Sequence, residues 1–352
     1  MKILYGIQAT GNGHLSRAMD IIPVLKRYGE VDILISGKCA DISIPHPIRY
    51  KLNGLSFFFG KKGGIDYWAT IKNMDGRLLW QEIKQLPIKD YDLVINDFEP
   101  VSAWAARLRN VPSVSLSHQS AVVHKMSPKP LQTDWLGMSI LKYYAPADHL
   151  YGFHFAEYGD QIFTPVIRNQ IRYQKISNEG HYTVYLPAYD DETIIKKLSH
   201  FETVKWEVFS KHSKEAYQID NISVVPINAD AFARSMASCE GVLCGAGFET
   251  PAEALFLGKK LMVVPMKSQY EQQCNAASLK LMGVPVLKNL KKKRLHKIES
   301  WLDSHERVAV NYPDITEPII RLVMEKCFGH DPYRFLTLAG KGIRTANNAR
   351  LY

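Results

Sequence analysis

Cysteines and long apolar runs are scarce in this sequence of 352 residues. Its five cysteines are odd in number and show no C-x-x-C spacing, which argues against a disulfide framework and against a zinc site. No apolar run approaches the roughly 18 residues that span a bilayer. The first residues also lack the apolar segment and cleavage site of a signal peptide. We therefore expect a cytoplasmic protein that holds no metal.

Low-complexity tracts and repeats of fixed period are also missing. Hydrophobic residues make up 46% of the chain and charged residues 22%, a balance typical of globular proteins. The net charge of +9 favours phosphate-bearing partners without choosing among them. The basic run 291–294 has no interleaved aromatics, so it does not indicate a nucleic-acid groove. We interpret it as solvated surface, and contact with a membrane surface stays open.

Short apolar runs alternate with amphipathic stretches along both halves of the chain. This rhythm predicts an α/β protein with two Rossmann-like domains, each built on a parallel sheet. The predicted domains are residues 1–168 and 169–330, and a tail, 331–352, packs back on the first. Ligands of such sheets bind beyond the carboxyl ends of the strands, in a cleft between the domains. The predicted strands are 2–7, 31–36, 93–96, 111–117, 182–186, 206–209, 223–227, 241–244 and 261–264.

The loop after the first predicted strand contains Gly11-Asn12-Gly13-His14-Leu15-Ser16-Arg17. It lacks the Gly-Lys-Ser/Thr ending of a P-loop, and Ser16 breaks the G-x-G-x-x-G pattern. His14 stands between the glycines and a predicted helix, where an imidazole can accept a proton near neutral pH. Its position alone fits a catalytic base and a structural histidine equally well.

A second loop begins with Asp97, directly after the predicted strand 93–96. A carboxylate there can orient a histidine and stabilise its protonated form. Aspartate is equally a favoured helix N-cap. Both interpretations remain open for Asp97.

The segment with the strongest signal is 241–255, in which an apolar strand, a small-residue loop and a helix start follow one another. Backbone amides at such a helix start bind anions, and Glu253, one turn inside, can accept hydrogen bonds from ribose hydroxyls. The plainer alternative is a tight strand-to-helix turn with a solvated Glu253.

Three motifs together resemble a known family. The string G-A-G-F-E-T-P-A-E-A-L (245–255), followed by E-Q-Q-C-N-A (271–276), is similar to the donor-binding signature of UDP-glycosyltransferases with the GT-B fold. The N-terminal G-N-G-H-L-S-R resembles the acceptor loop of the same group, and 94–98 through 111–114 resembles the stretch that carries its aspartate. The resemblance spans about three quarters of the chain.

The resemblance implies an inverting, metal-independent glycosyltransferase with no cofactor beyond a nucleotide sugar, expected to be UDP-linked. His14 would be the base and Asp97 its partner. Peripheral contact with a membrane is compatible with this resemblance, and nucleic acid is not an expected partner. The implied donor-binding residues are Ile227, Gly245, Gly247, Phe248, Glu249, Thr250, Glu253, Glu271 and Gln272, and the implied acceptor-binding residues are Gly11, Gly13, His118 and Gln119.

The sequence departs from the family pattern at two of these positions. Gly245 stands where many members have a phosphate-binding histidine, and Glu271 replaces a common aspartate. Two rival functions therefore stay open: a nucleotide-sugar epimerase of the same architecture, and a noncatalytic sugar-nucleotide-binding protein. A nicotinamide oxidoreductase is disfavoured because the dinucleotide fingerprint is missing.

Overall fold

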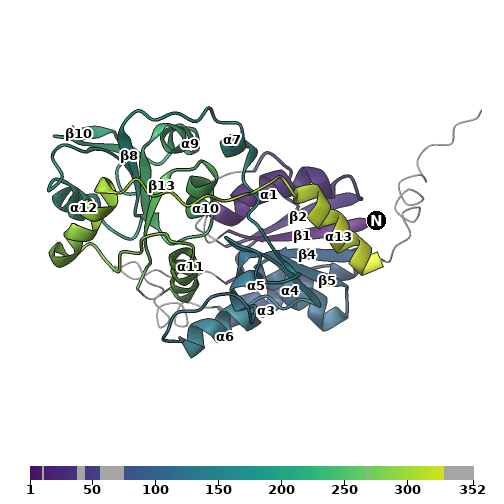
Figure 1. Cartoon of the computed structure of the whole chain (residues 1–352). Coiled ribbons are helices and arrows are strands. Elements are labelled where there is room, and N and C mark those ends of the chain that lie inside the picture. The colour runs from purple at the N-terminus through teal and green to yellow at the C-terminus, as the bar shows by residue number, and fades with distance from the viewer. Residues whose placement is uncertain (10–11, 38–43, 56–74, 268, 329–352) are drawn as a thin grey trace, which may run out of the picture.

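The computed structural model describes residues 1–9, 12–37, 44–55, 75–267 and 269–328, which form two α/β units, each with its own sheet (Figure 1). In this part of the chain the first sheet has seven strands, and all neighbouring strands are parallel. In spatial order they are β3 (Tyr50–Leu52), β2 (Glu30–Ser36), β1 (Lys2–Gln8), β4 (Leu93–Asp97), β5 (Ser113–Ser117), β6 (His149–Phe153) and β7 (Ile162–Phe163).

The second sheet has six strands in the described residues, and all are parallel except for one edge hairpin. Asp220 adopts a φ of 48° in the two-residue turn of that hairpin, a left-handed conformation that Asp tolerates better than most residues. The spatial order is β10 (Tyr217–Ile219), β11 (Ile222–Pro226), β9 (Lys205–Ser210), β8 (His181–Tyr185), β12 (Gly241–Gly245) and β13 (Lys260–Val264).

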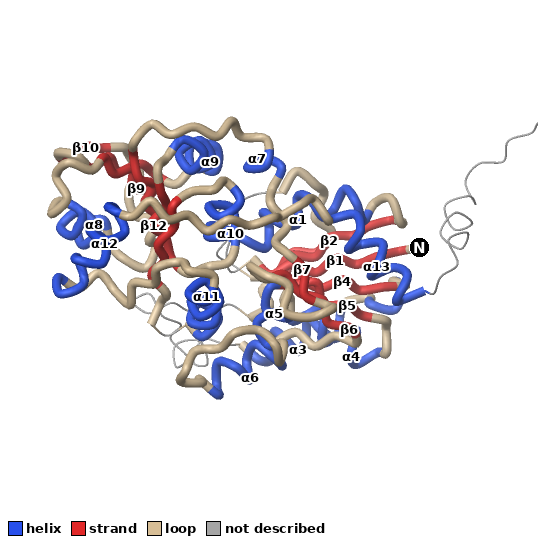
Figure 2. The backbone as a smooth tube through the Cα atoms, in the orientation of Figure 1, coloured by secondary structure: helices blue, strands red, loops and turns tan. Residues whose placement is uncertain are grey.

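Helices connect the strands and flank the sheets (Figure 2). Short 3-10 turns occupy Ile88–Asp90 and Lys292–Arg294. The α-helices are α1 (Asn12–Leu25), α3 (Gly76–Gln85), α4 (Pro100–Arg109), α5 (His118–Val123), α6 (Trp135–Tyr143), α7 (Asn169–Arg172), α8 (Asp191–Leu198), α9 (Ala229–Ser238), α10 (Glu249–Phe256), α11 (Tyr270–Leu281), α12 (Leu295–Asp303) and α13 (Thr316–Phe328).

Each sheet is covered on both faces because its strands alternate side chains between two cores. On β1, Tyr5 belongs to the core cluster that includes Leu15 of α1, whereas Leu4 belongs to the cluster that includes Val101 of α4. In the second sheet, Val184 shares a cluster with Trp301 of α12. This two-sided burial explains the nearly continuous apolar strands, and it positions the strand ends on which the site is built.

The nine predicted strands all exist, with ends within two residues of those predicted. The sequence pattern missed β3, β6, β7 and β10, which are short or partly exposed. Two of these missed strands, β6 and β7, lie shortly before the predicted domain boundary and extend the first sheet. The domain boundary near Arg168 stays a prediction, and the predicted tail, 331–352, lies outside the described residues.

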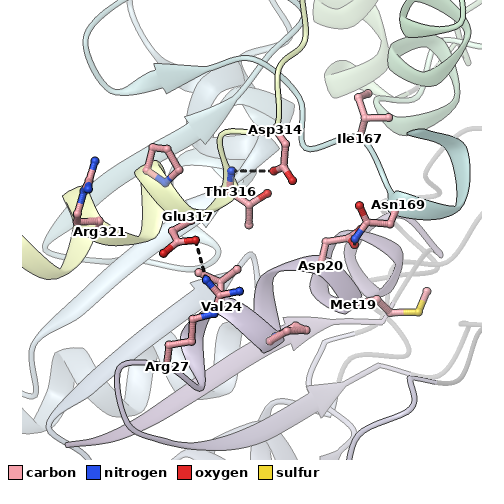
Figure 3. A pocket seen from close by; sticks show the side chains of 12 residues that line it. Met19, Asp20, Val24, Arg27, Ile167, Asn169, Asp314, Thr316, Glu317 and Arg321 are labelled. Atoms are coloured by element: carbon pink, nitrogen blue, oxygen red, sulfur yellow. Dashed lines mark hydrogen bonds and ion pairs between the residues drawn. The ribbon is translucent and has the colours of Figure 1, made fainter. Parts of the chain in front are cut away.

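The C-terminal part of the described chain returns to the first unit. Helix α13 packs against α1, and Ile320 and Val323 belong to the same core cluster as Ile21. Beside this contact lies a cavity of about 530 Å³ between α1, α7 and α13 (Figure 3). The ion pair between Arg27, in the turn after α1, and Glu317 of α13, at 2.6 Å, lies along it.

Candidate active site

The two units meet through residues that follow the carboxyl ends of their strands. His14 and Arg17 on α1 follow β1, Asp97 ends β4, and His118 follows β5. From the second unit, Glu249 follows β12. In parallel sheets these ends share one edge, which is where ligands bind.

His14 and Asp97, predicted as base and partner, are brought together. The Nδ1 atom of His14 lies 2.9 Å from Oδ1 of Asp97, so that an Nδ1–H donates to the carboxylate and Nε2 keeps a lone pair. Asp97 is fully buried, whereas the His14 side chain is 13% exposed. This arrangement leaves Nε2 as the proton acceptor.

The electrostatics of the pair follow from burial and from their neighbours. Burial by itself lowers the pKa of His14, but the charge and hydrogen bond of Asp97 outweigh it, and the pKa is raised. Burial raises the pKa of Asp97, but Arg17 and His14 together hold it below its usual value. Asp97 is therefore an ionised carboxylate that favours the protonated imidazole.

Asp97 is not the N-cap of α4. Glu99 caps this helix: its carboxylate accepts hydrogen bonds from the amides of Val101 and Ser102, each at 2.7 Å. Between Asp97 and Glu99, Phe98 adopts a φ of 56° and its ring stacks with that of His14, with ring centroids 6.5 Å apart. A bulky residue in this region is strained, and such strain gathers at functional sites. The turn frees Asp97 for His14.

Arg17 is a site residue that the sequence analysis did not assign. It is 2% exposed, and its NH2 atom donates to both oxygens of Asp97, at 2.9 and 2.8 Å. Its NH1 atom donates to Glu249 of the second unit. Arg17 stands three residues after His14 on α1, and that spacing, which places both on one helix face, was the signal that could have identified it.

The loop predicted to bind the donor leaves open space beside Gly245 and Gly247. A Cβ placed on Gly247 would meet nothing within 4 Å, and one placed on Gly245 would meet only Gln272 Oε1, at 3.9 Å. Helix α10 begins directly after Phe248 without a side-chain cap, and Thr250 lies half-buried in its first turn. The amides of this helix start are therefore suited to an anion.

Glu249 and Glu253 point to partners other than those predicted from the sequence. The Glu249 side chain pairs with Arg17 and would lie 3.2 Å from a Cβ on Gly13. Glu253 is 2% exposed and accepts from Nε and NH2 of Arg168, at 2.5 and 2.7 Å. Arg168, in the connection between the sheets, was missed as a partner because nothing local links it to Glu253.

The remaining predicted donor residues have protein partners in the structure. Glu271 accepts from Gln119 Nε2 at 3.0 Å, and Gln272 Oε1 accepts from the Met266 amide at 3.0 Å. The Ile227 amide donates to the Ser210 carbonyl, at 2.9 Å, after the end of β11. These contacts place Ile227 at the end of β11, Gln272 beside the loop after β13, and Glu271 against α5 of the first unit.

His118, predicted to contact the acceptor, is buried between the two units. Its Nδ1 lies 2.8 Å from the Phe153 carbonyl, and its Nε2 lies 2.8 Å from Asn275 Oδ1 of α11. Its ring stacks on Phe248 with centroids 3.9 Å apart, and burial lowers its pKa. His118 and Gln119 thus connect the first unit to the donor loop. Their predicted role toward an acceptor stays a prediction, and Gly11 lies outside the described residues.

Among the described residues no helix has the length and apolarity that crossing a membrane requires. The same part of the chain holds no group of three or more His, Cys, Asp or Glu side chains placed for a metal ion. The predicted metal independence remains a prediction.

Solved structures similar to this chain include glycosyltransferases and an epimerase. MurG of Acinetobacter baumannii is 14% identical, with a TM-score of 0.55 over 92% of this chain and 99% of that one. UGT2 of Phytolacca americana, solved with UDP-2-fluoro-glucose and pterostilbene, is 13% identical, with a TM-score of 0.54 over 96% and 93%. A UDP-N-acetylglucosamine 2-epimerase is 13% identical, with a TM-score of 0.52 over 93% and 96%.

These likenesses establish the fold: the two units form a GT-B architecture, as the sequence predicts. No curated protein matches the sequence. The family model of glycosyl transferase family 1 matches residues 1–304. The chain belongs to this family and is a glycosyltransferase.

Proposed function

We propose that the protein is an inverting transferase that moves a sugar from a nucleotide donor, expected to be UDP-linked, to an acceptor hydroxyl. The observation that carries this proposal is the His14–Asp97 pair, whose Nε2 is left to accept a proton. Arg17 links this pair to the helix that follows the open glycine loop, because it binds both Asp97 and Glu249. A base beside an anion site is what sugar transfer from a diphosphate requires.

In the proposed reaction the acceptor oxygen attacks the anomeric carbon while His14 Nε2 takes the hydroxyl proton. The bond between the anomeric carbon and the phosphate oxygen breaks, and the nucleoside diphosphate leaves with the electron pair. Asp97 stabilises the imidazolium that forms. A single displacement from the opposite face inverts the anomeric centre. The amides at the start of α10 would stabilise the leaving diphosphate without a metal.

Glu253 is proposed to bind the ribose hydroxyls, although Arg168 already engages both of its oxygens. A carboxylate offers about four acceptor positions, so the ribose would use those that Arg168 leaves. Glu249 is proposed to serve the donor only through its main chain, because its carboxylate is bound to Arg17.

The acceptor-side partner is open, and we propose that the first unit touches a membrane surface peripherally. Large apolar side chains lie exposed on and before α6: Met126, Leu131, Trp135, Leu136 and Tyr143 are between 53% and 107% exposed. Lys125 and Lys142 are exposed beside them. Apolar side chains flanked by lysines suit an anionic lipid surface.

The first test combines ligand binding and turnover. Thermal unfolding with UDP, GDP, TDP, CDP, ADP and NAD identifies the nucleotide, because a ligand at about 100 times its Kd stabilises the folded state by about 2.7 kcal/mol. With the matching nucleotide sugar, His14→Ala should lose about 10² to 10⁴ in kcat and keep the nucleotide shift. His149→Ala, at an exposed position where β6 begins, is the control and should keep both.

Near-normal turnover of His14→Ala would remove the base assignment. A shift with NAD alone would contradict the donor site. Incubation of the donor without acceptor separates the rivals, since an epimerase would release an epimer from donor alone and a binding protein would leave every donor and acceptor unchanged.

A further inference from the structure

The ion pair between Arg17 and Glu249 joins the proposed base to the second unit. Arg17 binds both oxygens of Asp97 through NH2 and reaches Glu249 through NH1. Together with His14, these groups form one chain of four that starts at His14, passes through the buried Asp97 and Arg17, and ends at Glu249 on α10. A fork-shaped guanidinium can hold two carboxylates in fixed geometry, which an ammonium cannot do.

Glu249 is the first residue of α10, the helix that directly follows the donor loop. Its carboxylate points back over the start of α1, since a Cβ on Gly13 would lie 3.2 Å from Glu249 Cδ. Any movement of α10 therefore moves a negative charge relative to the His14–Asp97 pair.

Three charged groups face His14 from the elements packed around it, among the residues that the structure describes. Asp97 at the end of β4 and Glu249 on α10 are negative and favour the imidazolium, whereas Arg17 on α1 is positive and opposes it. Tyr5 on β1 lies near Asp97 and Arg17, and it is neutral because burial raises its pKa. Of these three charged groups, Glu249 is the one that belongs to the second unit.

We propose that Arg17 is a positioning residue that ties the His14–Asp97 pair to α10 through Glu249, so that the placement of the donor-side helix sets the basicity of His14. The inference rests on the proposed role of His14 as the base. Its consequence is that a donor bound at the start of α10 and the base on α1 share one electrostatic network, and the Glu249 carboxylate belongs to the base rather than to the phosphates.

The test is a direct NMR titration of His14 in the full-length protein labelled at histidine Cε1, with the signal assigned by its loss in His14→Gln. In Glu249→Gln a negative charge is removed and Arg17 is left less neutralised, so the His14 midpoint should move to lower pH. In Arg17→Met a positive charge is removed, and the midpoint should move to higher pH. Arg17→Lys keeps the charge and should fall between Arg17→Met and the unsubstituted protein.

The matched control is Glu317→Gln, which removes a carboxylate that also pairs with an arginine, Arg27 in the turn after α1, but is more than half exposed. It should leave the His14 midpoint unchanged. If Arg17→Met does not fold, Glu249→Gln alone decides, because its side chain is 20% exposed and its amide keeps the size and shape. A His14 midpoint in Glu249→Gln equal to that of the unsubstituted protein would overturn the inference.

This outcome is distinguishable from failure of the proposed function. Normal turnover of His14→Ala ends the base assignment whatever the titrations show. Loss of turnover in His14→Ala together with unmoved midpoints keeps the base and removes the link to α10.

Discussion

Asp97 serves two partners at once, and this sharing defines the site at the scale of single residues. One carboxylate accepts from His14 and from Arg17, and it is fully buried. A buried carboxylate needs this compensation, because an unpaired charge there costs several kcal/mol. Glu99 releases Asp97 from capping α4. Of the two acidic residues that flank Phe98, Glu99 therefore has the structural role and Asp97 contacts His14.

The raised pKa of His14 makes its contribution to stability depend on pH. Its folded-state pKa lies above the ordinary value of 6.5, so the protonated ring stabilises the folded state fully below that value. This contribution is lost as pH rises through the folded pKa. We therefore expect the free energy of unfolding of the unsubstituted protein to exceed that of His14→Asn by more at about pH 6 than at about pH 9.

Urea denaturation at both pH values measures this difference. The comparison variant is His149→Asn, at an exposed position where β6 begins. A His14→Asn deficit that grows with pH would mean that the His14 pKa is lowered in the folded state.

At the scale of elements, two glycines have different roles: one allows close packing, and the other faces open space. Gly152 on β6 lies against α5, and a Cβ there would stand 2.4 Å from the Ala121 backbone nitrogen. Gly247 after β12 faces open space, since nothing lies within 4 Å of its Cβ position. The first glycine is required for packing, and the second keeps room beside the start of α10.

Alanine at these two positions should therefore separate stability from binding. Gly152→Ala should destabilise the protein by about 1 to 3 kcal/mol, as overpacking against backbone does. Gly247→Ala should change the free energy of unfolding by less than about 0.5 kcal/mol and reduce the nucleotide-induced thermal shift. Chemical denaturation and thermal unfolding with the matching nucleoside diphosphate measure both. An undiminished shift in Gly247→Ala would place the phosphates elsewhere.

At the scale of the whole molecule, the two sheets share one core and one charge network. A single cluster contains Tyr5 of the first sheet, Val242 of the second and Ile320 of α13. His118 and Gln119 extend the contact to α11 through polar bonds. The apolar side chains on and before α6 remain outside this core and define an outward-facing surface.

We expect that surface to bind anionic vesicles. The double variant Trp135→Ser with Leu136→Ser should cosediment less than the unsubstituted protein with vesicles of phosphatidylcholine and phosphatidylglycerol, because it loses the apolar area that would be buried. Ile219→Ser, at an exposed position of β10 in the second unit, should bind as before. Equal sedimentation of all three proteins, or none with any vesicle, would contradict the membrane proposal.

The sequence by itself determined nine of the thirteen described strands, the alternation that makes both sheets mostly parallel, and the loops that follow β1, β4 and β12. Hydrophobic periodicity and glycine placement are local properties, so they can be seen along the chain. The family resemblance added the pairing of His14 with Asp97, which the structure brings within 2.9 Å.

Only the tertiary structure decided which polar side chains from distant parts of the sequence lie in contact. Arg17 and Glu249 are 232 positions apart, Arg168 and Glu253 are 85 apart, and His118 and Asn275 are 157 apart. Each pair forms because strand ends of separate sheets, or the connection between the sheets, are packed against one another. No local pattern encodes such a contact, since it depends on how whole units pack rather than on how neighbouring residues fold.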